Sequence, residues 1–212
     1  MKNQFITLLI IVLSVIFISG CLESKDPINP LGKNISEFQT SVCNIPSGED
    51  LLFYRIYQSE NDSKPGIIHS NETLMSNADL VFYGTVKEVR PSVWTTPDGK
   101  TPSQVLNASP ELGVRTIGDE NCVRNYRFVS VPGTNESIYT SVIFEADDWV
   151  KGPTMDEVVI EIQGGQVDRY VMLGSYVNPW DLKPGDKYLV YANFWDGNRS
   201  LIMPNGLFVV ED

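Results

Sequence analysis

Residues 138–147 read IYTSVIFEAD, and apolar or small side chains occupy every second position of this stretch. Ile138, Val142 and Phe144 fall on one side of an extended chain, whereas Glu145 falls on the other. Side chains of a β-strand alternate between the two faces of a sheet, so a period of two is typical of a strand with one buried face. The stretch therefore predicts a half-buried antiparallel strand.

The same alternation continues on both sides of this stretch. It predicts further strands at residues 51–57, 80–87, 158–163, 188–194, 201–203 and 207–210. Turns rich in glycine and proline separate these runs, and Asp196-Gly197 is typical of a tight hairpin. One short helix is expected at 71–78, capped by Ser70. The fold class is mainly β: a small antiparallel OB-like barrel of about five to six strands with one short helix.

A long polar insertion at about 91–136 interrupts the strand pattern. It contains Cys122 and one candidate strand at 126–131. We expect residues 43–212 to form a single β-barrel-like domain that carries this insertion.

The first twenty residues have the composition of an export signal. Lys2 is followed by an apolar run from residue 5 to residue 18, which is too short to cross a bilayer comfortably as a helix. Small residues end the run, so we expect residues 1–20 to be a signal peptide. The alternative is a plain N-terminal membrane anchor.

The run ends in Ile-Ser-Gly-Cys at 18–21, which resembles the lipobox of prokaryotic lipoproteins. The resemblance implies cleavage before Cys21 and lipid attachment to its sulfur. Residues 21–42 are polar and punctuated by proline at their start, which suits a tether between the lipid and the domain. The expected location is the extracytoplasmic face of the cell membrane, with the lipid anchor as the contact with the membrane.

Three further stretches resemble the netrin-like modules, which include the tissue inhibitors of metalloproteinases. They read NADLVFYGTV at 77–86, FEADDWVKG at 144–152 and PGDKYLVYA at 184–192. The resemblance covers about 70–212 without the insertion, and it implies an OB-type barrel. Those inhibitors bind the protease zinc through a free N-terminal cysteine, whereas Cys21 is expected to be lipidated. The resemblance therefore carries over the fold and not the inhibitory residues.

Charge excludes one class of partner. The 212 residues carry a formal net charge of −11, and removal of 1–20 leaves 192 residues at −12. A nucleic-acid-binding protein needs clustered lysine and arginine, so we expect no nucleic-acid partner.

The two remaining cysteines, Cys43 and Cys122, are expected to form a disulfide in an oxidising compartment. Two buried free thiols are the alternative. Asn-X-Ser/Thr sequons are more frequent than the composition gives by chance, which favours a glycosylated surface protein over a merely Asn-rich polar surface. The sequon asparagines are Asn34, Asn61, Asn71, Asn107, Asn135 and Asn198.

The sequence gives no catalytic constellation. His69 is the single histidine and has no evident nucleophile beside it, and no serine lies in a Gly-X-Ser-X-Gly turn. Asp79 and Asp147-Asp148 offer oxygen ligands for Ca²⁺, but they lack the spacing of an EF-hand, and a solvated strand end explains Asp147-Asp148 better. We therefore expect no catalytic residue, no metal and no cofactor.

The four tryptophans have two interpretations. Trp94, Trp149, Trp180 and Trp195 either fill the core of a small barrel or form a stacking platform for a sugar or a peptide. The function we expect is a lipid-anchored, non-enzymatic binding module for a protein or a glycan. The alternatives are a secreted hydrolase with acidic catalytic residues and a barrel that inhibits proteases.

Overall fold

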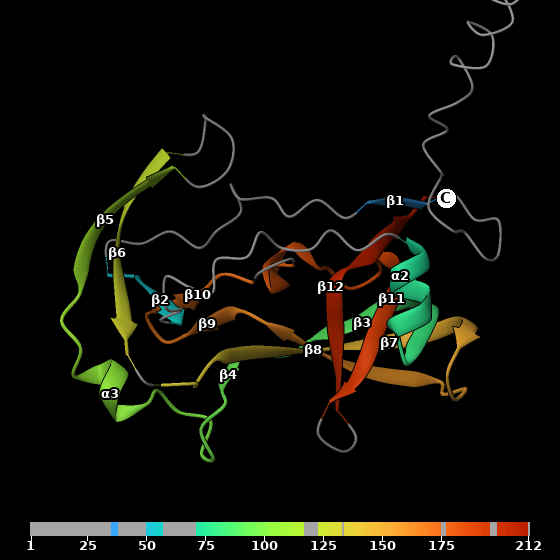
Figure 1. Cartoon of the computed structure of the whole chain (residues 1–212), viewed down its shortest axis with the longest axis horizontal. Coiled ribbons are helices and arrows are strands. Elements are labelled where there is room, and N and C mark those ends of the chain that lie inside the picture. The colour runs from blue at the N-terminus through green and yellow to red at the C-terminus, as the bar shows by residue number, and fades with distance from the viewer. Residues whose placement is uncertain are drawn as a thin grey trace, which may run out of the picture.

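The computed structural model describes residues 35–37, 50–56, 71–116, 123–132, 134–174, 177–195 and 199–211. Most of these residues are in strands, which form a closed barrel at one end of the molecule and a second sheet at the other (Figure 1). No described helix is long and apolar enough to span a bilayer. The expected signal peptide, Cys21, Cys43 and Cys122 lie outside the described residues, and so does most of the tether.

Five strands close the barrel. They are β3 (Leu80–Val89), β7 (Ile138–Lys151), β8 (Glu157–Gln163), β11 (Lys187–Trp195) and β12 (Arg199–Val210). The ring runs β3-β7-β8-β12-β11 and returns to β3. Every neighbouring pair is antiparallel except β8 and β12, which are parallel. The expectation of a mainly β, OB-like barrel is confirmed, with one parallel pair that closes the ring.

The barrel interior holds the predicted apolar positions. Phe82, Phe144 and Tyr188 are among the large side chains in this core, and Phe144 contacts both other rings edge-on. Because the apolar residues of each strand face inward at every second position, a closed ring of five strands is filled by side chains. The alternation in the sequence thus marks the inside of the barrel.

Strand β3 is buried on both faces, which its alternating pattern did not indicate. Val81 and Tyr83 point outward but are fully covered. Helix α2 (Asn71–Asn77) packs there through Leu74, which forms an outer cluster with Tyr191 of β11. The predicted helix is therefore confirmed, and it explains why an outward aromatic residue is buried.

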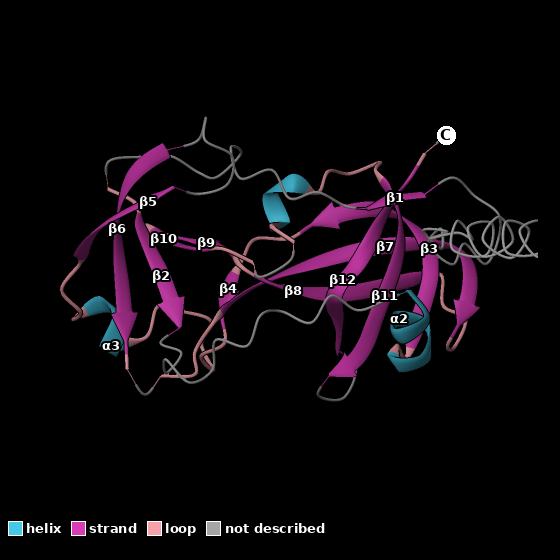
Figure 2. Cartoon of the chain, turned by 45° about the horizontal axis from the view of Figure 1, so that its top comes forward, coloured by secondary structure: helices cyan, strands magenta, loops and turns pink. Residues whose placement is uncertain are grey.

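The second sheet contains the strands β5 (Glu111–Thr116), β6 (Val123–Val131), β2 (Leu52–Ile56), β10 (Tyr170–Met172) and β9 (Gly165–Val167), in this order across the sheet. The central strand β2 runs parallel to both of its neighbours, β6 and β10. Figure 2 shows this sheet at the opposite end of the molecule from α2.

The insertion supplies much of the second sheet and its core. Besides β5 and β6 it contributes β4 (Val93–Trp94), which pairs with β7, and the short helix α3 (Ser103–Leu106). Trp94 is 1% exposed and lies edge-on to Tyr54 of β2, with ring centroids 4.8 Å apart. The polar insertion is thus part of a folded layer that also uses residues from both flanks of the chain.

Two short elements complete the fold. Strand β1 (Ile35–Glu37) pairs antiparallel with the end of β12, and the 3₁₀ helix η3 (Pro179–Asp181) precedes β11. Trp195 pairs with Arg199 across the β11–β12 hairpin, whose predicted turn residues 196–198 lie outside the described part of the chain.

Candidate functional site

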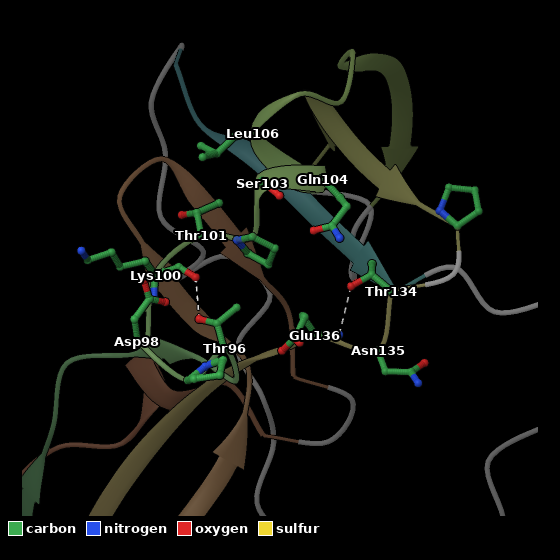
Figure 3. Close-up of a pocket in the computed structure, with 13 residues that line it drawn as sticks. Thr96, Asp98, Lys100, Thr101, Ser103, Gln104, Leu106, Thr134, Asn135 and Glu136 are labelled. Atoms are coloured by element: carbon green, nitrogen blue, oxygen red, sulfur yellow. Dashed lines mark hydrogen bonds between the residues drawn. The ribbon is translucent and has the colours of Figure 1, made fainter.

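A polar groove of about 790 Å³ lies where the insertion leaves and rejoins the barrel. Figure 3 shows one wall formed by residues 96–100 and the opposite wall formed by residues 134–136, with α3 between them. The lining residues are Thr96, Pro97, Asp98, Lys100, Thr101, Pro102, Ser103, Gln104, Leu106, Pro132, Thr134, Asn135 and Glu136. Its volume falls in the range typical of ligand-binding clefts.

The 96–100 wall is a tight turn that its sequence, Thr-Pro-Asp-Gly-Lys, specifies. Gly99 has φ +70°, a conformation that glycine adopts without steric cost, and its N–H donates to the Thr96 carbonyl at 2.9 Å. The Thr96 hydroxyl donates to the Lys100 carbonyl at 2.7 Å, and the Lys100 N–H donates to an Asp98 carboxylate oxygen at 3.2 Å. The backbone donor at Lys100 lowers the pKa of Asp98, so this carboxyl stays ionised at neutral pH.

The 134–136 wall is fixed from the second sheet and from the loop after β4. The Tyr54 hydroxyl donates to the Glu136 carbonyl at 2.9 Å. The Thr95 hydroxyl donates to the Glu136 carboxylate, while the Glu136 N–H donates to the Thr134 hydroxyl at 3.2 Å. Strands from different parts of the chain therefore hold this wall in place.

The groove presents hydroxyl and amide groups to solvent. Ser103 and Gln104 are exposed on α3, and Asn135 is exposed on the opposite wall. Such side chains both donate and accept hydrogen bonds, as do the hydroxyl groups of sugars. The chemistry of the lining is therefore suited to a polar, uncharged ligand.

A second surface feature lies at the start of β7. The rings of Tyr139 and Trp195 stack with centroids 5.2 Å apart and an interplanar angle of 27°. Both side chains are partly exposed. Two other tryptophans serve the interior: Trp94 is buried in the second core, and Trp149 packs on Phe82 of the barrel core with ring centroids 5.1 Å apart. Trp180 lies in η3 and is partly exposed. The sequence left both interpretations of the tryptophans open, and Trp195 is the one in this surface stack.

The candidate metal ligands lie apart and have structural partners. Asp79 accepts a hydrogen bond from the Phe194 N–H at 3.0 Å, and Asp147 accepts one from the Thr85 hydroxyl at 3.1 Å. Within the described residues no group of three or more His, Cys, Asp or Glu side chains could hold a metal ion.

The sequon asparagines are only partly covered by the structure. Asn107 and Asn135 are exposed, and Asn71 is the first residue of α2. Asn34, Asn61 and Asn198 lie outside the described residues, as do His69 and the three cysteines. The expected lipid and disulfide sites thus remain predictions.

Sequence reasoning missed the groove as a site. The Thr-Pro-Asp-Gly turn signal was available in the sequence, but its hydroxyl groups follow no ligand motif. The two walls are separated by more than thirty residues, and only the tertiary structure brings them together.

None of the protein-family models, curated proteins or solved structures compared with this chain matches it. The proposals below rest on the chain's own residues and geometry.

Proposed function

We propose that this chain is a lipid-anchored cell-surface protein that binds a glycan in the groove without converting it chemically. The observation that carries the proposal is the lining of the groove by hydroxyl and amide side chains between two folded walls. The sequence predicts a binding module for a protein or a glycan. Of these two ligands, the lining of the groove favours the glycan.

The polarity of the groove favours a glycan over a protein. The centre of a protein interface is typically apolar and rich in aromatic residues. Leu106, at 57% exposure, is the one large apolar side chain of the groove that stands out as exposed. A sugar instead requires many hydrogen-bond partners, which threonine, serine, asparagine and glutamine side chains supply.

The charge of the groove favours a neutral glycan. Asp98 and Glu136 contribute carboxyl groups to the lining, and Lys100 contributes one amine. The whole chain has a formal net charge of −11. Anionic sugars would meet repulsion from this surface, because like charges at an interface are unfavourable.

The two groove carboxylates support a binding role better than hydrolysis. Hydrolysis of a glycoside needs one carboxylic acid that is protonated near neutral pH. The pKa of Asp98 is lowered rather than raised, and Glu136 accepts a hydrogen bond from Thr95 that positions it in the wall. A hydrolase remains the alternative that a turnover assay addresses directly.

The position of β1 suits display of the groove away from the membrane. Thirteen residues, 22–34, separate Cys21 from β1. An extended chain of that length spans at most about 45 Å. Figure 1 places β1 near the barrel end of the molecule and α3 at the other end. A lipid on Cys21 would therefore hold the barrel end nearer to the bilayer.

The anchor is tested with Cys21→Ser in a bacterial host that processes lipoproteins. We expect wild-type protein to sediment with membranes and to carry the mass of the lipidated chain from residue 21. The variant should lose the lipid mass and the cleavage before residue 21. Unchanged processing and unchanged membrane fractionation of the variant would overturn the lipid anchor.

Glycan binding is tested with the mature protein in detergent on an array of neutral and anionic glycans. Gln104→Ala removes one exposed amide from the groove, and we expect affinity to fall about three- to tenfold, the value of one hydrogen bond. Gln166→Ala is the matched control, because Gln166 is exposed outside the groove. Absence of binding to any glycan, or release of hydrolysed sugar, would contradict the proposal.

A further inference from the structure

The Tyr139–Trp195 stack joins two strands that are not neighbours in the barrel. Tyr139 belongs to β7 and Trp195 ends β11, and both rings are partly exposed. The guanidinium carbon of Arg199 lies 5.9 Å from the centre of the Trp195 ring. The aromatic pair thus already has a cation of the chain beside it, which argues against a cationic ligand.

A nearly buried carboxylate lies in the same region. Glu161 of β8 is 9% exposed, and both of its carboxylate oxygens accept from the Ser141 hydroxyl, at 3.0 and 3.1 Å. The described part of the chain places no lysine or arginine within 4.0 Å of it. A carboxylate has about four acceptor positions, so one hydroxyl leaves capacity for further donors. Burial, and secondly the charge of Glu161, raises the pKa of Tyr139, which places this charge close to the stack.

The aromatic pair lies close to the groove along the chain. Tyr139 follows Glu136 by three residues on the same chain segment, a span of about 10 Å when extended. Ser137 connects the two regions, because its N–H donates to the Thr95 hydroxyl at 2.9 Å and its own hydroxyl accepts from the Gln163 amide at 3.3 Å. Gln163 is the cross-strand partner of Tyr139. One wall of the groove and the aromatic pair therefore belong to consecutive parts of one chain segment, a separation that an oligosaccharide but not a single sugar ring matches.

We propose that Tyr139, Trp195 and Glu161 form a second subsite that binds one ring of the neutral oligosaccharide held in the groove. This inference rests on the proposed glycan binding and adds how the ligand is recognised. The apolar C–H face of a sugar ring packs on the partly exposed aromatic pair. A hydroxyl group of the same ring donates to Glu161, which satisfies acceptor capacity that Ser141 leaves open. The subsite requires an oligosaccharide, whereas a monosaccharide fills the groove alone.

The experiment measures the affinity of the mature protein for a neutral oligosaccharide that the array identifies, and for its monosaccharide unit. Trp195→Ala removes half of the stack, and Glu161→Gln replaces the carboxylate with an amide of the same size. We expect each change to weaken oligosaccharide binding at least fivefold and to leave monosaccharide binding within twofold. Phe194→Ala is the matched control, because Phe194 is 50% exposed beside Trp195 and is not part of the stack.

The outcomes separate this inference from the proposed function. One outcome would contradict the subsite alone: the oligosaccharide binds, Gln104→Ala weakens its binding, and neither Trp195→Ala nor Glu161→Gln does. The proposed groove would then still hold. If neither form of the sugar binds wild-type protein, both proposals fail. Because Trp195→Ala could disturb the β11–β12 hairpin, loss of binding supports the subsite only when Glu161→Gln gives the same result in a protein with unchanged melting temperature.

Discussion

The phenol of Tyr54 donates a hydrogen bond of 2.9 Å to the backbone carbonyl of Glu136, 82 residues further along the chain. Tyr54 is 3% exposed in the centre of the second sheet, and Glu136 lines the groove. The core of the second sheet therefore sets the position of a groove wall, and this contact links stability to ligand binding.

Tyr54→Phe should uncouple these two regions. The substitution removes the hydroxyl group that donates to the Glu136 carbonyl. We therefore expect the free energy of unfolding to fall by about 1 kcal/mol. Urea unfolding checks the stability, and glycan affinity should fall as the wall shifts. Tyr188→Phe is the control: it loses a hydroxyl bonded to Asp186, which does not line the groove, so affinity should be unchanged. Equal effects of both variants on affinity would show that the Tyr54 contact does not position the wall.

Two groove threonines should respond in opposite ways to replacement by valine. The Thr101 hydroxyl oxygen is buried and has no hydrogen-bond partner among the described residues, so Thr101→Val removes an unpaired polar atom and should stabilise the fold by about 1 kcal/mol. Thr96→Val instead removes the bond to the Lys100 carbonyl and should destabilise it by about 0.5 kcal/mol. Thermal unfolding of both variants measures these two changes in stability. A destabilised Thr101→Val would show that its hydroxyl has a partner.

Gly165 should tolerate no side chain. It has φ +130°, and a β-carbon there would lie 2.1 Å from the Ser92 hydroxyl oxygen and 2.5 Å from the Thr140 hydroxyl oxygen. Gly165→Ala should therefore cost several kcal/mol, through strain at positive φ and loss of the Ser92–Thr140 contact. Gly185 has φ +96°, and no atom of the described part of the chain lies within 4 Å of the added carbon, so Gly185→Ala should cost only about 1 kcal/mol. Similar melting temperatures for the two variants would contradict the described packing of β9.

Alkaline pH should weaken the fold through Tyr191. Burial, and secondly the neighbouring Tyr83, raises the pKa of Tyr191 from 10.0 to about 12. The folded state therefore disfavours the phenolate, whereas the unfolded chain releases this proton near pH 10.0. The stabilisation is complete below about pH 9 and is lost as pH rises toward about 12. Tyr191→Phe should make urea unfolding less sensitive to pH in this window, and identical pH profiles of the two proteins would contradict the shift.

The barrel could be predicted because its strands carry local signals. Inward positions such as Val142 and Phe144 repeat at a period of two, and Gly-Pro turns mark the strand ends. The pairing of β8 with β12 could not be read from the sequence, because a parallel contact between distant segments leaves no local signal. The burial of Val81 and Tyr83 could not be predicted either. Alternation places them on the outer face of β3, which is buried only because α2 covers it.

The second sheet and the candidate site were harder to predict. Strands β9 and β10 have three residues each, too few for a periodic pattern, and β2 pairs with partners from two distant segments. The polar composition of the insertion hid the contribution of Trp94 to a core. A surface stacking platform was one of two open interpretations of the tryptophans, and the structure was needed to show that Trp195 stacks on Tyr139.

Closure of the barrel by β12 has a consequence for biogenesis. This strand pairs with β11, β8 and β1, and it is the last of the five barrel strands along the chain, so it is synthesised after the other four. Until it is synthesised, β3, β7 and β8 have no complete ring to join, so their apolar faces stay unprotected. Such a topology has a high contact order, which slows folding to milliseconds or longer. A holdase chaperone that shields the nascent chain would therefore raise the yield of this protein more than it would for a helical bundle of the same size.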